Sequence, residues 1–303
     1  MVKGPLLFLG MATQDFVSVV PHLPGPDEVM EASYVGVHGG GPAATAAVAC
    51  SRLGGKAQFI GALGADPIGK GILAELEQEG VDVSLTQVAA AATSPASVII
   101  VDAPSGHRSI LYSKGTATAL EYTAELDAAV RGAAVVHLDG YHIDTALRVV
   151  QTARQAGVLV SMDGGAGMLW PRMDELVSLS DLVVVARDFA TRVTGESTPV
   201  EAAKKLLKVG CALEVVITDG ANGAWYRSHT ESGHVPAFDV DVADTTGAGD
   251  VFHGAYALAR SEGKGVPSAV RWASAAAALK CGQPGGRKGI PGRQRLEEFL
   301  ARA

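Results

Sequence analysis

Cysteine is scarce in this chain: Cys50, Cys211 and Cys281 are its three cysteines, and they lie far apart. No Cys-x-x-Cys pair is present, so the sequence predicts neither a disulfide framework nor a zinc site. Only 19% of the residues are charged, and acidic residues outnumber basic ones by 32 to 25. This balance argues against a nucleic-acid partner and against binding to a membrane surface.

Long apolar runs are also missing, since none reaches the roughly 20 residues that span a bilayer. The five residues before the apolar run Leu6–Leu9 lack the features of a signal peptide. An apolar content of 48% over 303 residues is enough for one large core. We therefore expect a cytoplasmic enzyme that folds as a single domain over residues 1–303.

Short apolar runs alternate with amphipathic stretches along most of the chain. This alternation predicts an α/β fold with a mostly parallel sheet that is covered on both faces. Ligands of such sheets bind beyond the carboxyl ends of the strands, where Gly10, Asp139, Asp163 and Thr218 would gather. The expected strands are 6–10, 57–61, 134–138, 158–162, 182–186 and 213–218. The expected helices are 43–53, 66–79, 144–156, 201–209, 247–262 and 267–280.

Two stretches, 29–37 and 97–113, break this rhythm and have the character of β-hairpins. They do not fit inside a parallel sheet. We expect a small antiparallel lid over the ligand edge, with lid segments at about 12–38 and 96–115. Such a lid would either exclude water from a ligand or form a dimer interface.

The most informative segment is Asp244–Gly254, which reads D-T-T-G-A-G-D-V-F-H-G. A Gly-Ala-Gly turn at residues 247–249 leads into a helix-like stretch, so its backbone N–H groups form an anion site. Asp250 would repel a phosphate, which disfavours a role as an anion ligand. A carboxylate beside a phosphate is suited to take the proton from an attacking alcohol. An aspartate that only caps the helix is the alternative.

A second glycine-rich region, His38–Ala46, precedes a small, apolar helix. Its glycines allow a ligand to approach the backbone closely, and a polyhydroxyl ligand is a reasonable candidate. The chain contains no Gly-x-x-x-x-Gly-Lys-[Ser/Thr] loop and no Gly-x-Gly-x-x-Gly after the first strand. A P-loop and a dinucleotide-binding fold are therefore disfavoured.

With both regions in place, the chain resembles the ribokinase (PfkB) family of carbohydrate kinases over nearly its whole length. The resemblance implies a ribokinase-like three-layer α/β/α fold with a small β lid. It also implies transfer of the γ-phosphate of ATP to a primary hydroxyl of a small sugar. Mg²⁺ would arrive with ATP, and K⁺ is expected as a second cation. Independently of the resemblance, the lid strands expose edges that a second subunit could cover, so a homodimer through the lid is expected.

The resemblance also implies a role for each matching residue. Asp250 would be the base, and Gly247, Ala248 and Gly249 would hold the transferring phosphate. Sugar-binding residues would be Asp15, Gly40, Gly41, Asp139, Leu111 and Tyr141. Nucleotide-binding residues would be Arg187, Thr218, Gly220, Gly223, Ser274 and Ala278. A monovalent cation would lie among Asp244, Thr246, Gln283, Gly285 and Gly289. Without the resemblance, Asp15 fits a turn and residues 218–223 fit a hairpin turn.

The chain departs from the family at two places. Many members have Asn at the position of Ala44, and many have Asn-x-x-Glu where this chain has Ala186-Arg187-Asp188-Phe189. The missing motif leaves open how Mg²⁺ is held; Asp188 could substitute, or Arg187 could contact a phosphate. The missing motif also leaves open that the protein binds a sugar without catalytic activity. The intact Gly-Ala-Gly-Asp sequence favours an enzyme.

A narrower resemblance, to the sulfofructose kinase branch, covers residues 39–49, 244–255 and 278–291. That branch holds a sulfonate at the positions of Leu111 and Tyr141, and neither residue pairs with a sulfonate. We therefore expect a neutral ketohexose or pentose. A 6-deoxy-6-sulfofructose kinase and a nucleoside kinase are the alternatives.

Overall fold

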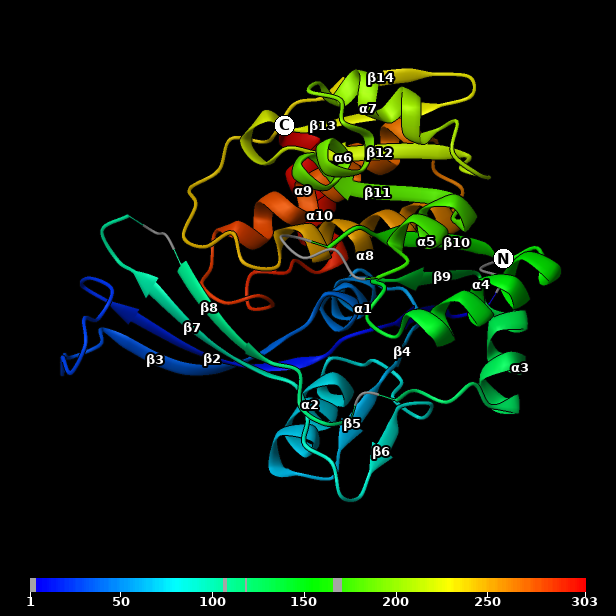
Figure 1. Ribbon diagram of the computed structural model, residues 1–303. Helices are drawn as coiled ribbons and strands as arrows, with labels where there is room; N and C mark the ends of the chain where they lie inside the picture. The colour runs from blue at the N-terminus through cyan, green and yellow to red at the C-terminus, as the bar shows by residue number, and fades with distance from the viewer. Residues whose placement is uncertain (1–3, 106–107, 118, 166–170) are drawn as a thin grey trace.

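The computed structural model describes residues 4–105, 108–117, 119–165 and 171–303, and its centre is an eight-stranded sheet (Figure 1). The strand order is β14-β13-β12-β11-β10-β9-β1-β4. The parallel strands are β1 (Leu6–Leu9), β4 (Ala57–Ile60), β9 (Val135–Leu138), β10 (Leu159–Asp163), β11 (Leu182–Ala186) and β12 (Glu214–Thr218). The antiparallel edge consists of β13 (Ala224–Ser228) and β14 (Ser232–Val235). The predicted, mostly parallel sheet is confirmed.

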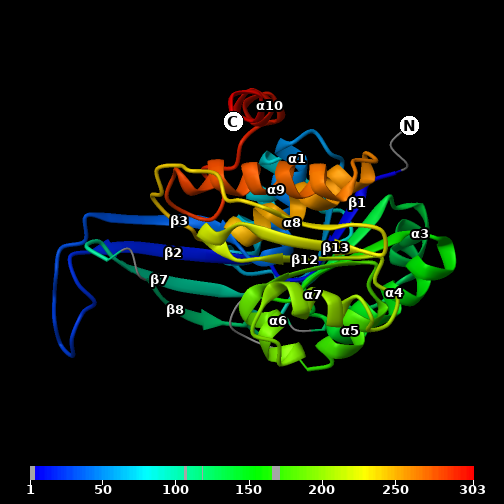
Figure 2. The same ribbon diagram turned by 90° about the horizontal axis from the view of Figure 1, so that it is seen from above.

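Helices cover both faces of this sheet, as Figure 2 shows from above. One layer contains α1 (Pro42–Arg52), α8 (Ala248–Ser261), α9 (Val266–Cys281) and α10 (Arg293–Arg302). The other contains α3 (Ala124–Gly132), α4 (Ile143–Ala156), α5 (Met173–Leu179), α6 (Arg187–Thr194) and α7 (Pro199–Leu206). Side chains of β1 alternate between the layers: Leu6 and Phe8 pack in one core, Leu7 and Leu9 in the other. This gives the expected three-layer fold.

A smaller unit extends from the sheet edge formed by β4. It consists of β5 (Ala62–Gly64), β6 (Gln87–Ala89) and α2 (Pro67–Gln78), and its two strands pair in parallel. Helix α2 begins where the sequence predicts, because Pro67 suits a first turn and the Asp66 side chain accepts a hydrogen bond from the Gly69 N–H.

The lid is a separate four-stranded sheet that projects from the body (Figure 1). Its order is β3-β2-β7-β8, with β2 (Thr13–Val20), β3 (Tyr34–Gly40), β7 (Ala96–Asp102) and β8 (Arg108–Ser113). The two outer pairings are antiparallel, as expected, whereas β2 pairs with β7 in parallel.

The lid differs from the sequence prediction in its first half. The strand expected at 29–37 begins only at Tyr34 and continues into the glycine region, to Gly40. Pro21, Pro24 and Pro26 lie in the segment before it, and proline cannot donate to a strand ladder. Its antiparallel partner is β2, which was not predicted as a strand.

No helix within the described ranges has both the length and the apolar character needed to cross a bilayer.

Candidate active site

Helix α8 begins at the Gly-Ala-Gly turn, where the sequence predicts an anion site. Gly247 is the N-cap and has a φ of 74°, a left-handed conformation that favours glycine. The Ala248 N–H donates to the Thr245 carbonyl at 3.2 Å, whereas the N–H groups of Gly247 and Gly249 have no hydrogen-bond partner within the described chain. Two backbone donors at the positive end of a helix are thus available to an anion.

Asp250 lies in the first turn of α8, next to these donors. Burial, followed by the nearby carboxylate of Asp163, raises its pKa to about 7, against the opposing effects of His253 and Arg287. A carboxylate with a pKa near 7 is well matched to general-base catalysis at neutral pH. Asp163 ends β10 and Asp139 follows β9, so these two carboxylates lie at the carboxyl ends of neighbouring strands, as predicted, and both act electrostatically on Asp250.

Asp139 is 2% exposed and connects three segments of the site. Its Oδ2 accepts hydrogen bonds from the N–H groups of Met11 (2.8 Å) and Ala43 (3.3 Å), and its Oδ1 accepts one from Tyr141 (2.9 Å). Burial raises the pKa of Asp139 to about 6. These bonds fix the start of α1 next to Gly40 and Gly41. Direct contact of Asp139 with a sugar stays a prediction.

The inner face of the lid presents Asp15 toward the body. His38, Asp15, Ser97 and Tyr112 form one row across its four strands. Asp15 is buried and accepts a hydrogen bond from the Thr13 hydroxyl at 2.8 Å. Any side chain on Gly40 would collide with the Asp15 carboxylate, since a Cβ there would lie 2.1 Å from Oδ2. The structure thus brings Asp15 together with the predicted Gly40.

Leu111 needs a correction, because it faces away from Asp15. It continues a different row, with Val37, Phe16 and Val98, on the outer face of the lid. Side chains alternate along a strand, so Tyr112 occupies the inner face instead. The buried Tyr112 hydroxyl lies beside Tyr141, whose own hydroxyl donates to the Lys114 carbonyl at 3.2 Å. The structure thus brings Tyr141 together with the lid through Tyr112, the neighbour of the predicted Leu111, and a role of Tyr141 in sugar binding stays a prediction.

The residues predicted for the nucleotide lie at the carboxyl ends of β11 and β12 and on α9. Arg187 begins α6 directly after β11 and forms a 2.9 Å ion pair with Asp219, which follows Thr218. Gly220 starts the one-turn 3₁₀ helix η1 (Gly220–Asn222), which joins β12 to β13 and so is also the hairpin turn that the sequence predicts. Gly223, Ser274 and Ala278 complete the set; the last two lie half-buried on α9.

The predicted cation residues lie on two loops that meet at Asp244. The Asp244 carboxylate accepts hydrogen bonds from the N–H groups of Thr246 (2.8 Å) and Gly285 (2.7 Å). Gln283 and Gly289 both lie next to the carbonyl of Lys280. The fully buried Lys280 ammonium donates to the Asp244 carbonyl at 2.8 Å. This lysine was missed, because nothing in its local sequence shows that it is buried.

Arg287 was also missed. It is 3% exposed, its Nη2 donates to the Gly40 carbonyl at 2.6 Å, and its Nε donates to the Thr45 hydroxyl at 3.2 Å. Its Nη1 lies 3.3 Å from Glu75 of α2. The C-terminal loop is thereby tied to the lid, to α1 and to α2. A buried guanidinium behind Gly40 holds the glycine region in place.

The match to known proteins identifies the family. The model of the pfkB family carbohydrate kinases matches residues 5–293 of the chain. The chain belongs to this family. It is 32% identical to a ribokinase of Haemophilus influenzae, over the full length of both chains. A putative ribokinase from Agrobacterium tumefaciens superimposes with a TM-score of 0.90 at 30% identity, covering 99% of this chain and 98% of that one.

A ribokinase of Arabidopsis thaliana complexed with ribose and ATP superimposes with a TM-score of 0.88 at 28% identity, covering 98% of this chain and 99% of that one. Membership in this family makes the protein a phosphotransferase that acts on an alcohol group of a carbohydrate.

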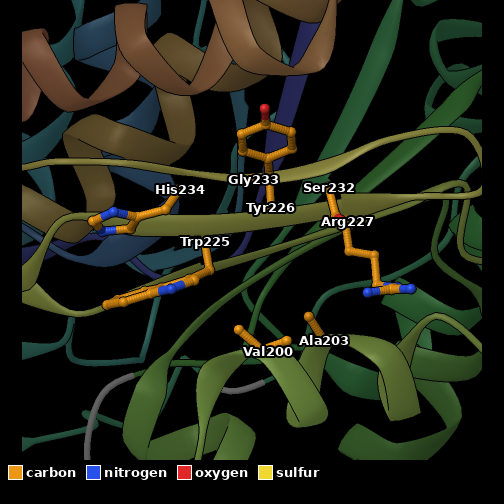
Figure 3. A pocket seen from close by; sticks show the side chains of 8 residues that line it. All are labelled: Val200, Ala203, Trp225, Tyr226, Arg227, Ser232, Gly233 and His234. Atoms are coloured by element: carbon orange, nitrogen blue, oxygen red, sulfur yellow. The ribbon is translucent and has the colours of Figure 1, made fainter.

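A cavity of about 260 Å³ lies elsewhere, between α7 and the β13–β14 edge (Figure 3). Its lining includes Val200, Arg227 and the ring pair Trp225–His234, whose centroids are 4.3 Å apart. None of the predicted site residues lines it, so it has no part in the site described here.

Proposed function

We propose that this protein transfers the γ-phosphate of ATP to a primary hydroxyl of a neutral ketohexose or pentose. The observation that carries the proposal is Asp250, a carboxylate with a pKa of about 7. It lies beside two N–H groups at a helix start that have no partner among the described residues. Relatives named ribokinase and fructokinase, together with the ribose and ATP in the Arabidopsis structure, support this substrate class.

In this mechanism Asp250 takes the proton of the sugar hydroxyl as its oxygen attacks the γ-phosphorus in line. The bond from that phosphorus to the β-γ bridging oxygen breaks, and ADP leaves. The N–H groups of Gly247 and Gly249 stabilise charge on the transferring phosphoryl oxygens. Asp15, on the inner face of the lid, accepts hydrogen bonds from other sugar hydroxyls and orients the acceptor.

ATP would lie along the carboxyl ends of β11 and β12, with Arg187 and Thr218 near its phosphates and α9 near its base. Within the described chain no three His, Cys, Asp or Glu side chains are grouped to hold a metal. We infer that Mg²⁺ comes with ATP and would be held mainly by phosphate oxygens and water. The ion would offset the negative charge of the phosphates.

We further propose a K⁺ site at the two loops around Asp244. Asp244 supplies the one anionic side chain of that group, and both its oxygens already accept backbone N–H groups. Replacing NaCl by KCl at constant ionic strength is expected to raise turnover. Equal rates in both salts would contradict the proposed K⁺ site. The positive charge at these loops would then come from the buried Lys280 ammonium.

A homodimer through the lid completes the proposal. A row of exposed apolar side chains crosses the outer face of the lid. Its members are Val37 (57% exposed), Phe16 (38%), Val98 (45%) and Leu111 (58%). A continuous apolar row on a projecting sheet fits a second copy of the same sheet, because a two-fold axis pairs the row with itself.

The substrate is tested by ADP release with Mg-ATP and KCl across D-fructose, D-ribose, other ketoses and aldoses, nucleosides and sulfofructose. Turnover with a neutral ketose or pentose supports the proposal. Preference for a nucleoside or for sulfofructose would overturn the substrate assignment and leave the phosphoryl chemistry intact.

A further inference from the structure

Two buried histidines lie near the first turn of α8, His253 on the helix itself and His137 on strand β9. His253 follows Asp250 by three residues, so the two side chains are neighbours on one helix face. The His253 Nε2 lies 3.2 Å from Oδ1 of Asp163. His137 of β9 packs against His253 with ring centroids 5.2 Å apart. His253 is 6% exposed and His137 is 1% exposed, so neither imidazole is hydrated as on a surface.

The two imidazoles have different surroundings. Within the described chain no ion pair joins His137 to a carboxylate, and its Nδ1 lies 3.1 Å from the Ser161 hydroxyl. Burial, and after it His253, lower the pKa of His137 to about 3, against the opposing effect of Asp163. Burial also disfavours charge on His253, but the adjacent Asp163 outweighs it and raises the pKa of His253. In turn, His253 outweighs the effect of burial on Asp163 and lowers the pKa of that carboxyl to about 2. These two shifts and the 3.2 Å contact favour an ionised Asp163 paired with a protonated His253.

Charges from several elements surround Asp250. Asp139 after β9 and Asp163 of β10 repel a negative charge on Asp250, whereas His253 on its own helix and Arg287 of the C-terminal loop attract it. Lys280 of α9 also interacts electrostatically with Asp250. Asp163 is the carboxylate that repels a charge on Asp250 most strongly, and His253 lies 3.2 Å from it. A positive charge on His253 therefore weakens the repulsion between Asp163 and Asp250.

We propose that His253, held as an imidazolium by Asp163, is a positioning residue that keeps Asp250 ionised for proton abstraction. Its side chain touches neither sugar nor ATP in this role. His137 stays neutral and serves to exclude water from the pair. The inference rests on the proposed function, because it takes Asp250 as the base.

The test is the pH dependence of kcat/KM for the His253→Asn variant, with D-fructose or D-ribose, whichever the native protein phosphorylates. Loss of an opposite charge beside a carboxyl is expected to move the acid limb upward by about one pH unit or more, with the rate recovering near pH 9. A loss of rate that is equal at every pH would mean a merely structural role and overturn the proposal. His137→Asn is the matched control: it removes a neutral buried imidazole, so its acid limb should stay in place.

A second measurement works even when the His253 variant does not fold. In ¹⁵N-histidine-labelled native protein, the ring nitrogens of His253 should show the imidazolium shifts from pH 6 to pH 8, and those of His137 the neutral form. A neutral His253 at pH 7 would overturn the proposal. If the proposed function is wrong, the Asp250→Asn variant will keep its turnover. If only the role of His253 is wrong, Asp250→Asn will be inactive, but the acid limb of the pH profile of His253→Asn will lie at the native pH.

Discussion

Gly254 of α8 lies directly against the carbonyl oxygen of Ala46 in α1. A Cβ on Gly254 would lie 2.1 Å from that oxygen, closer than real atoms approach. Ala46 follows the start of α1 by about one turn and Gly254 follows the start of α8 by nearly two turns, so the contact keeps the two glycine-rich starts, at Gly41 and Gly247, near each other. Backbone packing thereby joins the two regions in which we propose that the sugar and the phosphate bind.

Gly254→Ala is therefore expected to separate these helices. We predict a loss of about 1–3 kcal/mol in unfolding free energy, as for other overpacked cores, together with reduced kcat. Thermal unfolding and ADP release measure the two effects. Gly132→Ala in α3 is the control, since a Cβ there meets nothing within 4 Å. Equal melting temperatures for the two variants would contradict the close packing of α1 on α8.

The pH profile of the native protein follows from Asp250. The base works in its ionised form, and its pKa is raised to about 7 by burial first and by Asp163 next. The kcat/KM for the acceptor should therefore fall as the pH drops below 7 and level off above it. An acid limb near pH 4, the ordinary range of an aspartate, would show that Asp250 is not the group that limits the rate.

Arg287→Lys is predicted to weaken sugar binding although the charge is retained. A lysine cannot reproduce the geometry in which Arg287 bonds the Gly40 carbonyl and the Thr45 hydroxyl and also faces Glu75. We expect the unfolding free energy to fall by about 1–3 kcal/mol, because buried hydrogen-bond partners are left without a donor. We also expect the KM for the sugar to rise more than the KM for ATP. An unchanged KM for both substrates would restrict Arg287 to a role in stability.

Leu111→Lys is predicted to convert the proposed dimer into a monomer. It places a charge in the exposed apolar row on the outer face of the lid. Sedimentation velocity at micromolar concentration reads the change in mass, and Val193→Lys on α6, also an exposed apolar position, is the control. A native protein that sediments as a monomer would refute the proposed dimer.

The layered fold was predictable because its signals are local. The buried strands are continuous apolar runs, as β11 (L-V-V-V-A) illustrates, and helix starts such as Asp66-Pro67 have capping chemistry. Strand β2 (T-Q-D-F-V-S-V-V) was missed since its pairing with β3 and β7 depends on distant segments. The placement of Leu111 failed for a related reason: a slip of one residue moves a side chain to the other face of a strand.

The buried charges of the site were beyond sequence reasoning. Arg287 bonds Thr45 across 242 positions of chain, and Lys280 bonds Asp244 across 36. His253 of α8 likewise pairs with Asp163 of β10, which lies far from it in the sequence. A lysine, an arginine and a histidine are usually exposed or partly exposed, so only tertiary structure shows that these three are buried and paired.

The most direct test of the account is ADP release by Asp250→Asn with Mg-ATP, KCl and the acceptor that the native protein prefers. The account predicts a fall in kcat of about 10²–10⁴-fold, the usual contribution of a general base. The fold should be intact, with a melting temperature at pH 8 at or above that of the native protein, because Asn carries none of the cost of ionising a half-buried carboxyl. Turnover within a few-fold of the native rate would contradict the assignment of Asp250 as the base.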